Sequence, residues 1–199
     1  QHWYRRTDRI NYIDNTSSEL VTKGGFDVKA GANYNITQNH NIYFNTGYYS
    51  KAPYFKFVFA NFSNAVVENL TNEKITAAEL GYGYNKSTAN VNINLYYTLW
   101  EDKSLLSREN IQLENNQQTR ALIRGLDAVH KGIEIEASRA ISHNFDLGFT
   151  FSYGDWKWTN DVNAELYDNN QVLIDSTQVF SKGLWRSEER RVGKECRSR

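Results

Sequence analysis

Three residues in the second half of the chain could do chemistry together. Glu134 and Glu136 alternate with isoleucines, and His130 lies four positions before Glu134 in the same segment. On a β-strand these three side chains would share one face, with the two carboxylates about 7 Å apart. A carboxylate pair is typical of glycoside hydrolysis, and the trio has the ligand types of a metal site.

The surrounding sequence favours a polar wall over an active site. Nothing in it gives either carboxylate a reason for a raised pKa, which an acid catalyst needs. The remaining histidines (His2, His40 and His143) fall at strand ends or in turns, and no glycine-rich phosphate loop precedes a helix. We therefore predict no catalytic residue, no metal site and no cofactor, and we expect that the protein is not an enzyme. A Glu134→Gln change that abolished a measured activity would revive the hydrolase hypothesis.

The clearest element is the segment 89–100, in which apolar and polar residues alternate. Successive side chains of a strand point to opposite faces, so one face would be apolar and the other rich in asparagine. Asparagine is a poor strand former, so the second face needs water or hydrogen-bonding partners. The length suits a tilted transmembrane strand, and its aromatic residues collect at one end, as near a membrane–water boundary. The residues that we predict to line a polar lumen are Glu79, Asn90, Asn92, Asn94, Glu134 and Glu136.

The same alternation predicts a series of strands. They cover 26–36, 42–51, 75–85, 89–100, 129–141 and 145–153, and a further strand begins at about 181. Short turns (37–41, 86–88, 142–144) alternate with long connections (53–74, 102–127, 159–180). Hairpin loops usually have about two to five residues, so three long connections at one end need a functional reason. Outer-membrane barrels have short periplasmic turns and long extracellular loops.

One strand fits this pattern less well. On 129–141 the apolar face would include Lys131 and Arg139, which leaves only a short apolar band between them. A Lys or Arg at the membrane midplane costs roughly 2–4 kcal/mol, and about 0–1 kcal/mol near the interfaces. Both residues lie towards the strand ends, where long side chains can reach the polar boundary.

Composition limits the protein class. No window approaches about eighteen consecutive apolar residues, which excludes a transmembrane helix. The sequence contains no Met, so we expect it to be an internal piece of a longer protein. Of the 23 basic and 23 acidic residues, six and three lie in 186–199, so residues 1–185 carry 17 and 20 and a net charge of −3. This mildly acidic body has no basic stripe, so we predict no nucleic-acid partner.

The last residues differ abruptly from the rest. Segment 186–199 fits neither a strand nor a helix, and it contains the only cysteine, Cys196. It resembles a translated sequencing adapter, and a solvated basic tail is the alternative. We therefore assign residues 1–184 to one barrel domain and interpret residues 185–199 as a non-native tail.

An aromatic run in the first long connection is the best candidate for ligand contact. It comprises Tyr54, Phe55, Phe57 and Phe59. Exposed aromatic side chains on a loop often mark a binding surface. Packing against neighbouring loops or over a barrel mouth explains the same run equally well.

Several segments together resemble the C-terminal part of the β-barrel of TonB-dependent outer-membrane receptors. They are 72–73 with 78–82, 96–103, 130–136 and 149–158. The likeness covers about residues 1–184, and Asn72 stands where the family commonly has Pro. It implies an all-β fold, with this chain forming a partial antiparallel transmembrane β-barrel of about seven strands out of 22. Such a piece should not fold alone, because its open edges would be unsatisfied in lipid.

The resemblance also implies a function and partners. It predicts a receptor in the bacterial outer membrane, in contact with lipid, for TonB-energised uptake of a scarce siderophore, haem, cobalamin or glycan. A small-molecule ligand would bind at the extracellular loops. The TonB complex would act through an N-terminal plug and contact segment that this sequence lacks. Two alternatives stay open: a passive porin-like outer-membrane channel and a soluble β-sandwich binding module.

Overall fold

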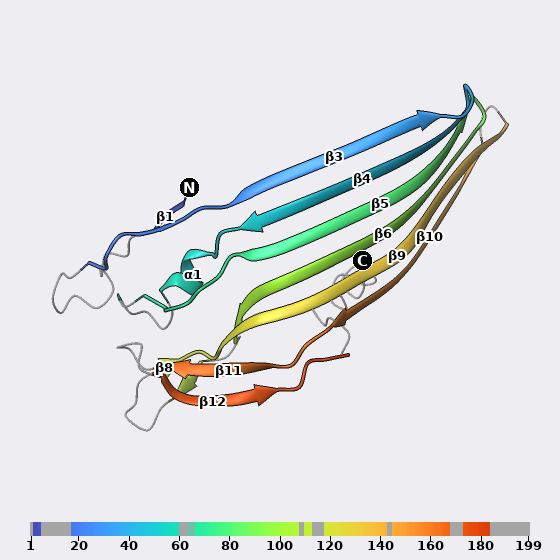
Figure 1. Ribbon diagram of the computed structural model, residues 1–199. Helices are drawn as coiled ribbons and strands as arrows, with labels where there is room; N and C mark the ends of the chain where they lie inside the picture. The colour runs from blue at the N-terminus through green and yellow to red at the C-terminus, as the bar shows by residue number, and fades with distance from the viewer. Residues whose placement is uncertain are drawn as a thin grey trace.

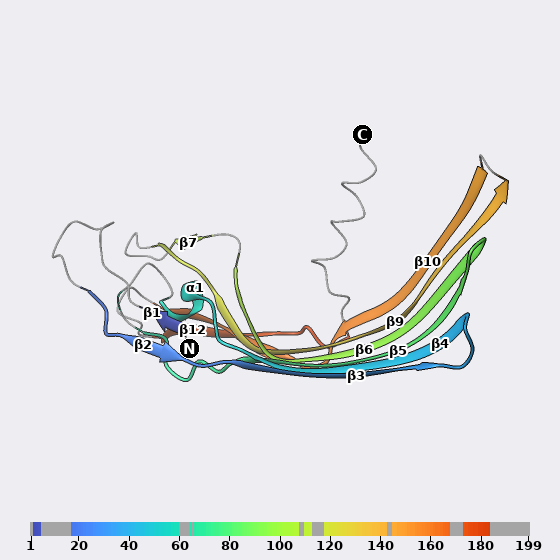
Figure 2. The ribbon, with the colours of Figure 1, turned by 90° about the horizontal axis from the view of Figure 1, so that it is seen from above.

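The computed structural model describes residues 2–4 (backbone only), 17–59, 64, 66–107, 110–112, 118–142, 145–167 and 173–183. Its main feature is one long antiparallel sheet that is curved into an open trough (Figures 1 and 2). Consecutive strands pair as a meander. They are β3 (Phe26–Asn35), β4 (His40–Lys51), β5 (Glu73–Lys86), β6 (Ala89–Leu106), β9 (Leu122–Ser142) and β10 (Phe145–Trp158). Such a sheet, open at both edges, is part of a β-barrel.

Smaller elements gather at one end of this sheet (Figure 1). Three pairs of short strands form there: β1 (His2–Tyr4) with β2 (Val21–Lys23), β7 (Ile111–Gln112) with β8 (Gln118–Thr119), and β11 (Val162–Tyr167) with β12 (Leu173–Val179). The single-turn helix α1 covers Phe55–Val58. None of the described helices is long and apolar enough to cross a membrane.

The strands predicted between residues 26 and 153 and the short turns are confirmed where the structure describes them. The strand predicted to begin at about 181 is wrong, because Lys182 and Gly183 form a turn in which Gly183 has a positive φ of 79°. Asn35 pairs with Asn41 around the first turn, and Lys86 pairs with Ala89 around the second. The tip of the third turn, 143–144, lies outside the described residues. The opposite end of the sheet holds the long connections, so the two ends are named here the short-turn end and the long-loop end.

The limits predicted for the connections at 102–127 and 159–180 are wrong, because paired strands extend into both segments. Strands β6 and β9 continue to pair as far as Leu106 with Leu122. Strand β11 then continues beside β9 where β10 ends, with Ala164 opposite Ile123. The sequence hides these extensions because they do not present one uniformly apolar face, so period-2 alternation is lost although the backbone pairing continues.

The register sorts the side chains of the sheet onto an apolar face and a polar face. No register shift interrupts the pairing from β3 through β5 to Trp100 of β6. One row of the apolar face runs through Phe44, Leu80, Leu95, Ile133 and Tyr153. The next row, on the polar face, runs through Tyr43, Gly81, Asn94, Glu134 and Ser152.

Many large side chains on the apolar face are about half exposed. Leu80 is 52% exposed and Leu95 is 46% exposed. A soluble β-sandwich buries this kind of face under a second sheet. No described strand covers it, so the sandwich alternative is wrong.

Glycines on the polar face make room for large neighbouring rings. The ring of Tyr43 occupies the space that a Cβ on Gly81 would fill. The hydroxyl of Tyr96 likewise lies against Gly132 and Gly154. Any larger residue at these positions would collide with the neighbouring tyrosine side chain.

Candidate functional site

The polar face is the candidate ligand path, and it brings together all the predicted lumen-lining residues. Asn92 lies opposite Glu136, and Asn94 lies opposite Glu134. Glu79 lies opposite Tyr96 one strand away. Near the short-turn end a groove of about 580 Å³ opens on this face. Its lining includes Asn41, Asn85, Asn90, Asn92, Glu136 and Thr150.

The carboxylates of this wall face neutral neighbours. Glu134 lies between Asn94 and Ser152, and Glu136 lies between Asn92 and Thr150 in the cross-strand rows. In the described part of the chain, no three His, Cys, Asp or Glu gather as metal ligands. The arrangement therefore offers many hydrogen-bonding groups along a wall.

His130 belongs to an aromatic cluster rather than to the carboxylate pair. Its side chain is 8% exposed, and its ring centroid is 5.9 Å from that of Trp100 and 5.8 Å from that of Trp156. The indole Nε1 of Trp156 donates a hydrogen bond to the hydroxyl of Tyr96 (2.9 Å). Sequence analysis did not single out this cluster. The sequence pattern could have shown it, because its four residues occupy polar-face positions in the period-2 alternation, near the long-loop ends of three strands. They are Tyr96, Trp100, His130 and Trp156.

The predicted aromatic run divides into two exposed and two buried residues. Tyr54 and Phe55 are 56% and 43% exposed, whereas Phe57 and Phe59 are 6% and 3% exposed. The buried pair joins a hydrophobic cluster, named here the loop core. It consists of Phe57, Val58, Phe59, Val67, Leu70 and Leu122. Ligand contact stays a prediction, and Tyr54 and Phe55 are the two side chains of the run that are exposed to make it.

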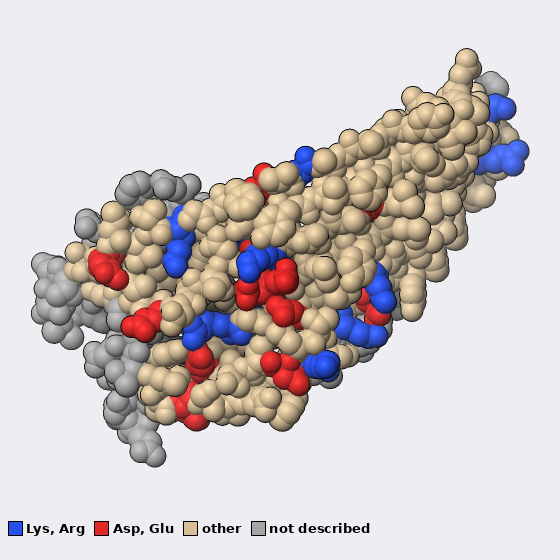
Figure 3. Space-filling model, in the orientation of Figure 1, with Lys and Arg blue, Asp and Glu red and all other residues tan. Residues whose placement is uncertain are grey.

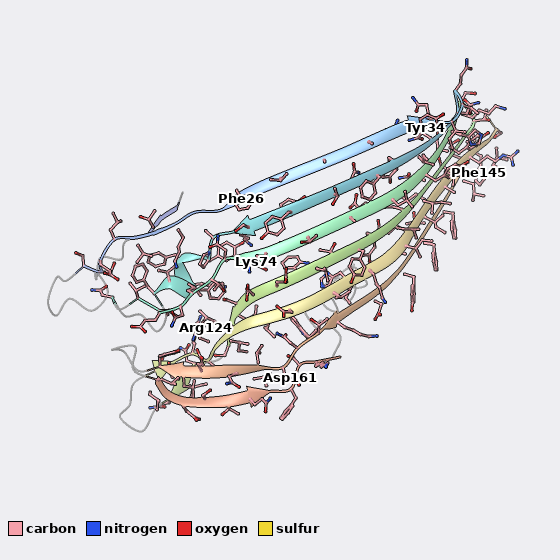
Figure 4. The ribbon with its side chains drawn as sticks, viewed as in Figure 1. Phe26, Tyr34, Lys74, Arg124, Phe145 and Asp161 are labelled. Carbon is pink, nitrogen blue, oxygen red and sulfur yellow. The ribbon has the colours of Figure 1, made fainter. Side chains whose placement is uncertain are left out.

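Arg124 links the connections around the loop core. Its Nε donates to the carboxylate of Glu165 (3.0 Å), and one of its terminal nitrogens donates to the backbone carbonyl of Glu68 (2.8 Å). The hydroxyl of Tyr167 donates to the same carboxylate of Glu165 (2.8 Å). Three segments that are distant in sequence are therefore held together at the long-loop end (Figure 4).

We predict an alkaline loss of this linkage. Burial raises the pKa of Tyr167, the hydrogen bond to Glu165 raises it further, and Arg124 opposes the shift. The stabilisation is therefore complete below the ordinary tyrosine pKa of about 10 and is lost as the pH rises through the higher folded value. Limited proteolysis of the β11–β12 hairpin at increasing pH should show an alkaline transition that Tyr167→Phe lacks. An identical transition in that variant would contradict the assignment.

Comparisons with known proteins support the barrel fold. Residues 3–187 match the family model described as TonB dependent receptor-like, beta-barrel. A solved structure described as Copper transporter OprC is similar, with a TM-score of 0.50 and 15% sequence identity. That similarity covers 77% of this chain and 28% of the transporter, and at this identity it shows the fold alone. None of the curated proteins matches the chain.

Proposed function

Because the chain belongs to the TonB-dependent receptor β-barrel family, we propose that it forms part of the wall of an outer-membrane receptor. In this proposal the receptor takes up a scarce ligand with energy supplied through TonB. Residues 1–184 belong to the barrel domain, and residues 185–199 are a non-native tail. The chain spans 28% of the length of the transporter that it resembles. The activity therefore belongs to the complete protein that contains this chain, called here the parent protein.

The observation that carries the proposal is the division of the sheet into two faces. A continuous apolar face suits contact with membrane lipid, and the opposite polar face suits a water-filled lumen. The long connections would then form the extracellular loops, where Tyr54 and Phe55 contact the ligand. The lumen wall of Glu79, Asn90, Asn92, Asn94, Glu134 and Glu136 supplies hydrogen-bonding groups along its path.

Uptake by the parent protein should depend on TonB. We expect cells that produce it to accumulate one member of the siderophore, haem, cobalamin and glycan classes, and to lose that accumulation when TonB is deleted. The measurement is uptake of labelled ligands from each class, with and without TonB. Because a passive channel needs no inner-membrane energy, uptake that persists unchanged without TonB would contradict the proposal and favour the porin-like alternative.

A further inference from the structure

Two basic residues lie at the short-turn end of the apolar face. Lys86 pairs with Ala89, and Ala89 pairs with Arg139, so the two basic residues flank one small side chain. Leu147 continues the same row on β10. Neighbouring strands are about 4.8 Å apart, so the two basic residues are roughly 10 Å apart at their backbones. Between these two long cationic side chains, Ala89 contributes only a methyl group.

Neither basic group has an acidic partner within the described part of the chain. Lys86 and Arg139 take part in none of its ion pairs or side-chain hydrogen bonds. Asp146 is the acidic residue nearest to them in the strand rows, but it pairs with Ala140 and therefore points to the polar face. Two positive charges at the edge of an apolar surface are thus left without compensation from the described protein.

The long-loop end of the same face is arranged differently. The Asp155 carboxylate lies 2.9 Å from the Lys157 ammonium and 3.9 Å from that of Lys131. Lys74 lies 2.9 Å from the carboxylate of Asp102. Figure 3 shows acidic and basic side chains together there, a band with few charged side chains beyond them, and basic side chains at the short-turn tip. The counter-charge at the tip must therefore come from outside these strands.

The surroundings of Arg139 also indicate where its charge is compensated. Ile141 and Phe145 lie beyond it towards the turn, and they are 56% and 58% exposed. A guanidinium among such side chains is costly in lipid unless it reaches the polar boundary and finds an anion there. Arginine binds phosphate through two parallel hydrogen bonds, and lysine adds a point charge. The adjacent row towards the middle of the face consists of Tyr84, Val91, Ala137 and Phe149.

We propose that Lys86 and Arg139 bind the phosphate of an anionic phospholipid headgroup at the short-turn rim of the barrel. This inference rests on the proposed function, because it requires the apolar face to contact lipid. The occupant is a membrane lipid, since the two basic residues border directly on the apolar row of Tyr84, Val91, Ala137 and Phe149, where its acyl chains would lie. The site fixes the depth of the short-turn rim in the membrane leaflet.

Native mass spectrometry of the purified parent protein, titrated with phosphatidylglycerol in detergent, tests this site. Replacing both cations in Lys86→Gln/Arg139→Gln should weaken phosphatidylglycerol binding roughly 10- to 30-fold, because each basic residue contributes about a fivefold factor. The matched control is Lys131→Gln/Lys157→Gln, which removes two lysines that share Asp155 and should leave this binding unchanged. The single variant Lys86→Gln should bind phosphatidylglycerol about fivefold more weakly. It replaces the double variant in this test if the double variant does not fold.

Equal lipid binding by the double variant and the wild type would overturn the proposal, as would an equal loss in the control. A separate measurement tests the lipid-facing assignment on which it rests. Tryptophan placed on the apolar face by Ile93→Trp should be quenched by brominated acyl chains in vesicles. If this tryptophan is quenched while the double variant still binds phosphatidylglycerol like the wild type, only the proposed headgroup site is wrong. If it is not quenched, the proposed orientation of the sheet is wrong.

Discussion

In the parent protein, Leu95→Arg is expected to lower the free energy of unfolding in lipid vesicles by about 2–4 kcal/mol. Leu95 lies in the middle of the apolar face, between Leu80 and Ile133. Its side chain is 46% exposed, so the cost arises from placing a charge in hydrocarbon and not from overpacking a core. The measurement is urea unfolding of the parent protein in phospholipid vesicles.

The matched control is Asn92→Arg, which introduces the same side chain on the opposite face of the same strand. Asn92 is exposed on the polar face, so the change should alter the free energy of unfolding by no more than about 0.5 kcal/mol. Equal destabilisation by the two variants would mean that both faces are packed against protein. A larger effect of Asn92→Arg would place the lipid on the other side.

The second large effect is expected in the loop core. Phe59→Ala should destabilise the long-loop end by about 3–5 kcal/mol, because it empties a site that is 3% exposed among Val58, Val67 and Leu122. The loss should be local, since β6 and β9 reach this cluster only at their long-loop ends, through Leu106 and Leu122. Hydrogen exchange of the parent protein should therefore accelerate in residues 53–72 and stay unchanged in β5 and in residues 89–100 of β6.

Phe55→Ala is the matched control for this prediction. Phe55 is 43% exposed, and its removal should cost less than about 1 kcal/mol. The two variants also separate packing from ligand contact, because Phe55→Ala should weaken ligand binding without increasing loop exchange. Similar exchange in both variants would contradict the division of the aromatic run into buried and exposed halves.

Much of the membrane-spanning part could be predicted from the sequence. Alternation in 26–36, 75–85 and 89–100 predicted the strands, their turns and which residues share a face, because one uniformly apolar surface forces a period of two. The six predicted lumen residues indeed share the polar face. Their role in lining a ligand path stays a prediction.

The neighbours of individual side chains depend on contacts between strands, which alternation within one strand does not reveal. Lys131 conflicts with an apolar face when its own strand is considered alone, but the register places Asp155 directly opposite it on β10. His130 shares a face with Glu134 and Glu136, yet its neighbours on β6 and β10 place it among tryptophans. These outcomes depend on which strands are adjacent and in which register.

The sequence by itself therefore determined the two-faced sheet, because that property resides in each strand separately and repeats every second residue. Only the tertiary structure decided the paired extensions of β6, β9 and β11, the loop core around Phe57 and the linkage through Arg124. The contacts of Arg124 join residues 41 and 56 positions apart, and the extension of β6 and β9 pairs Leu106 with Leu122. These features lie beyond the uniformly apolar face, where no environment imposes a periodic pattern that could be recognised in the sequence.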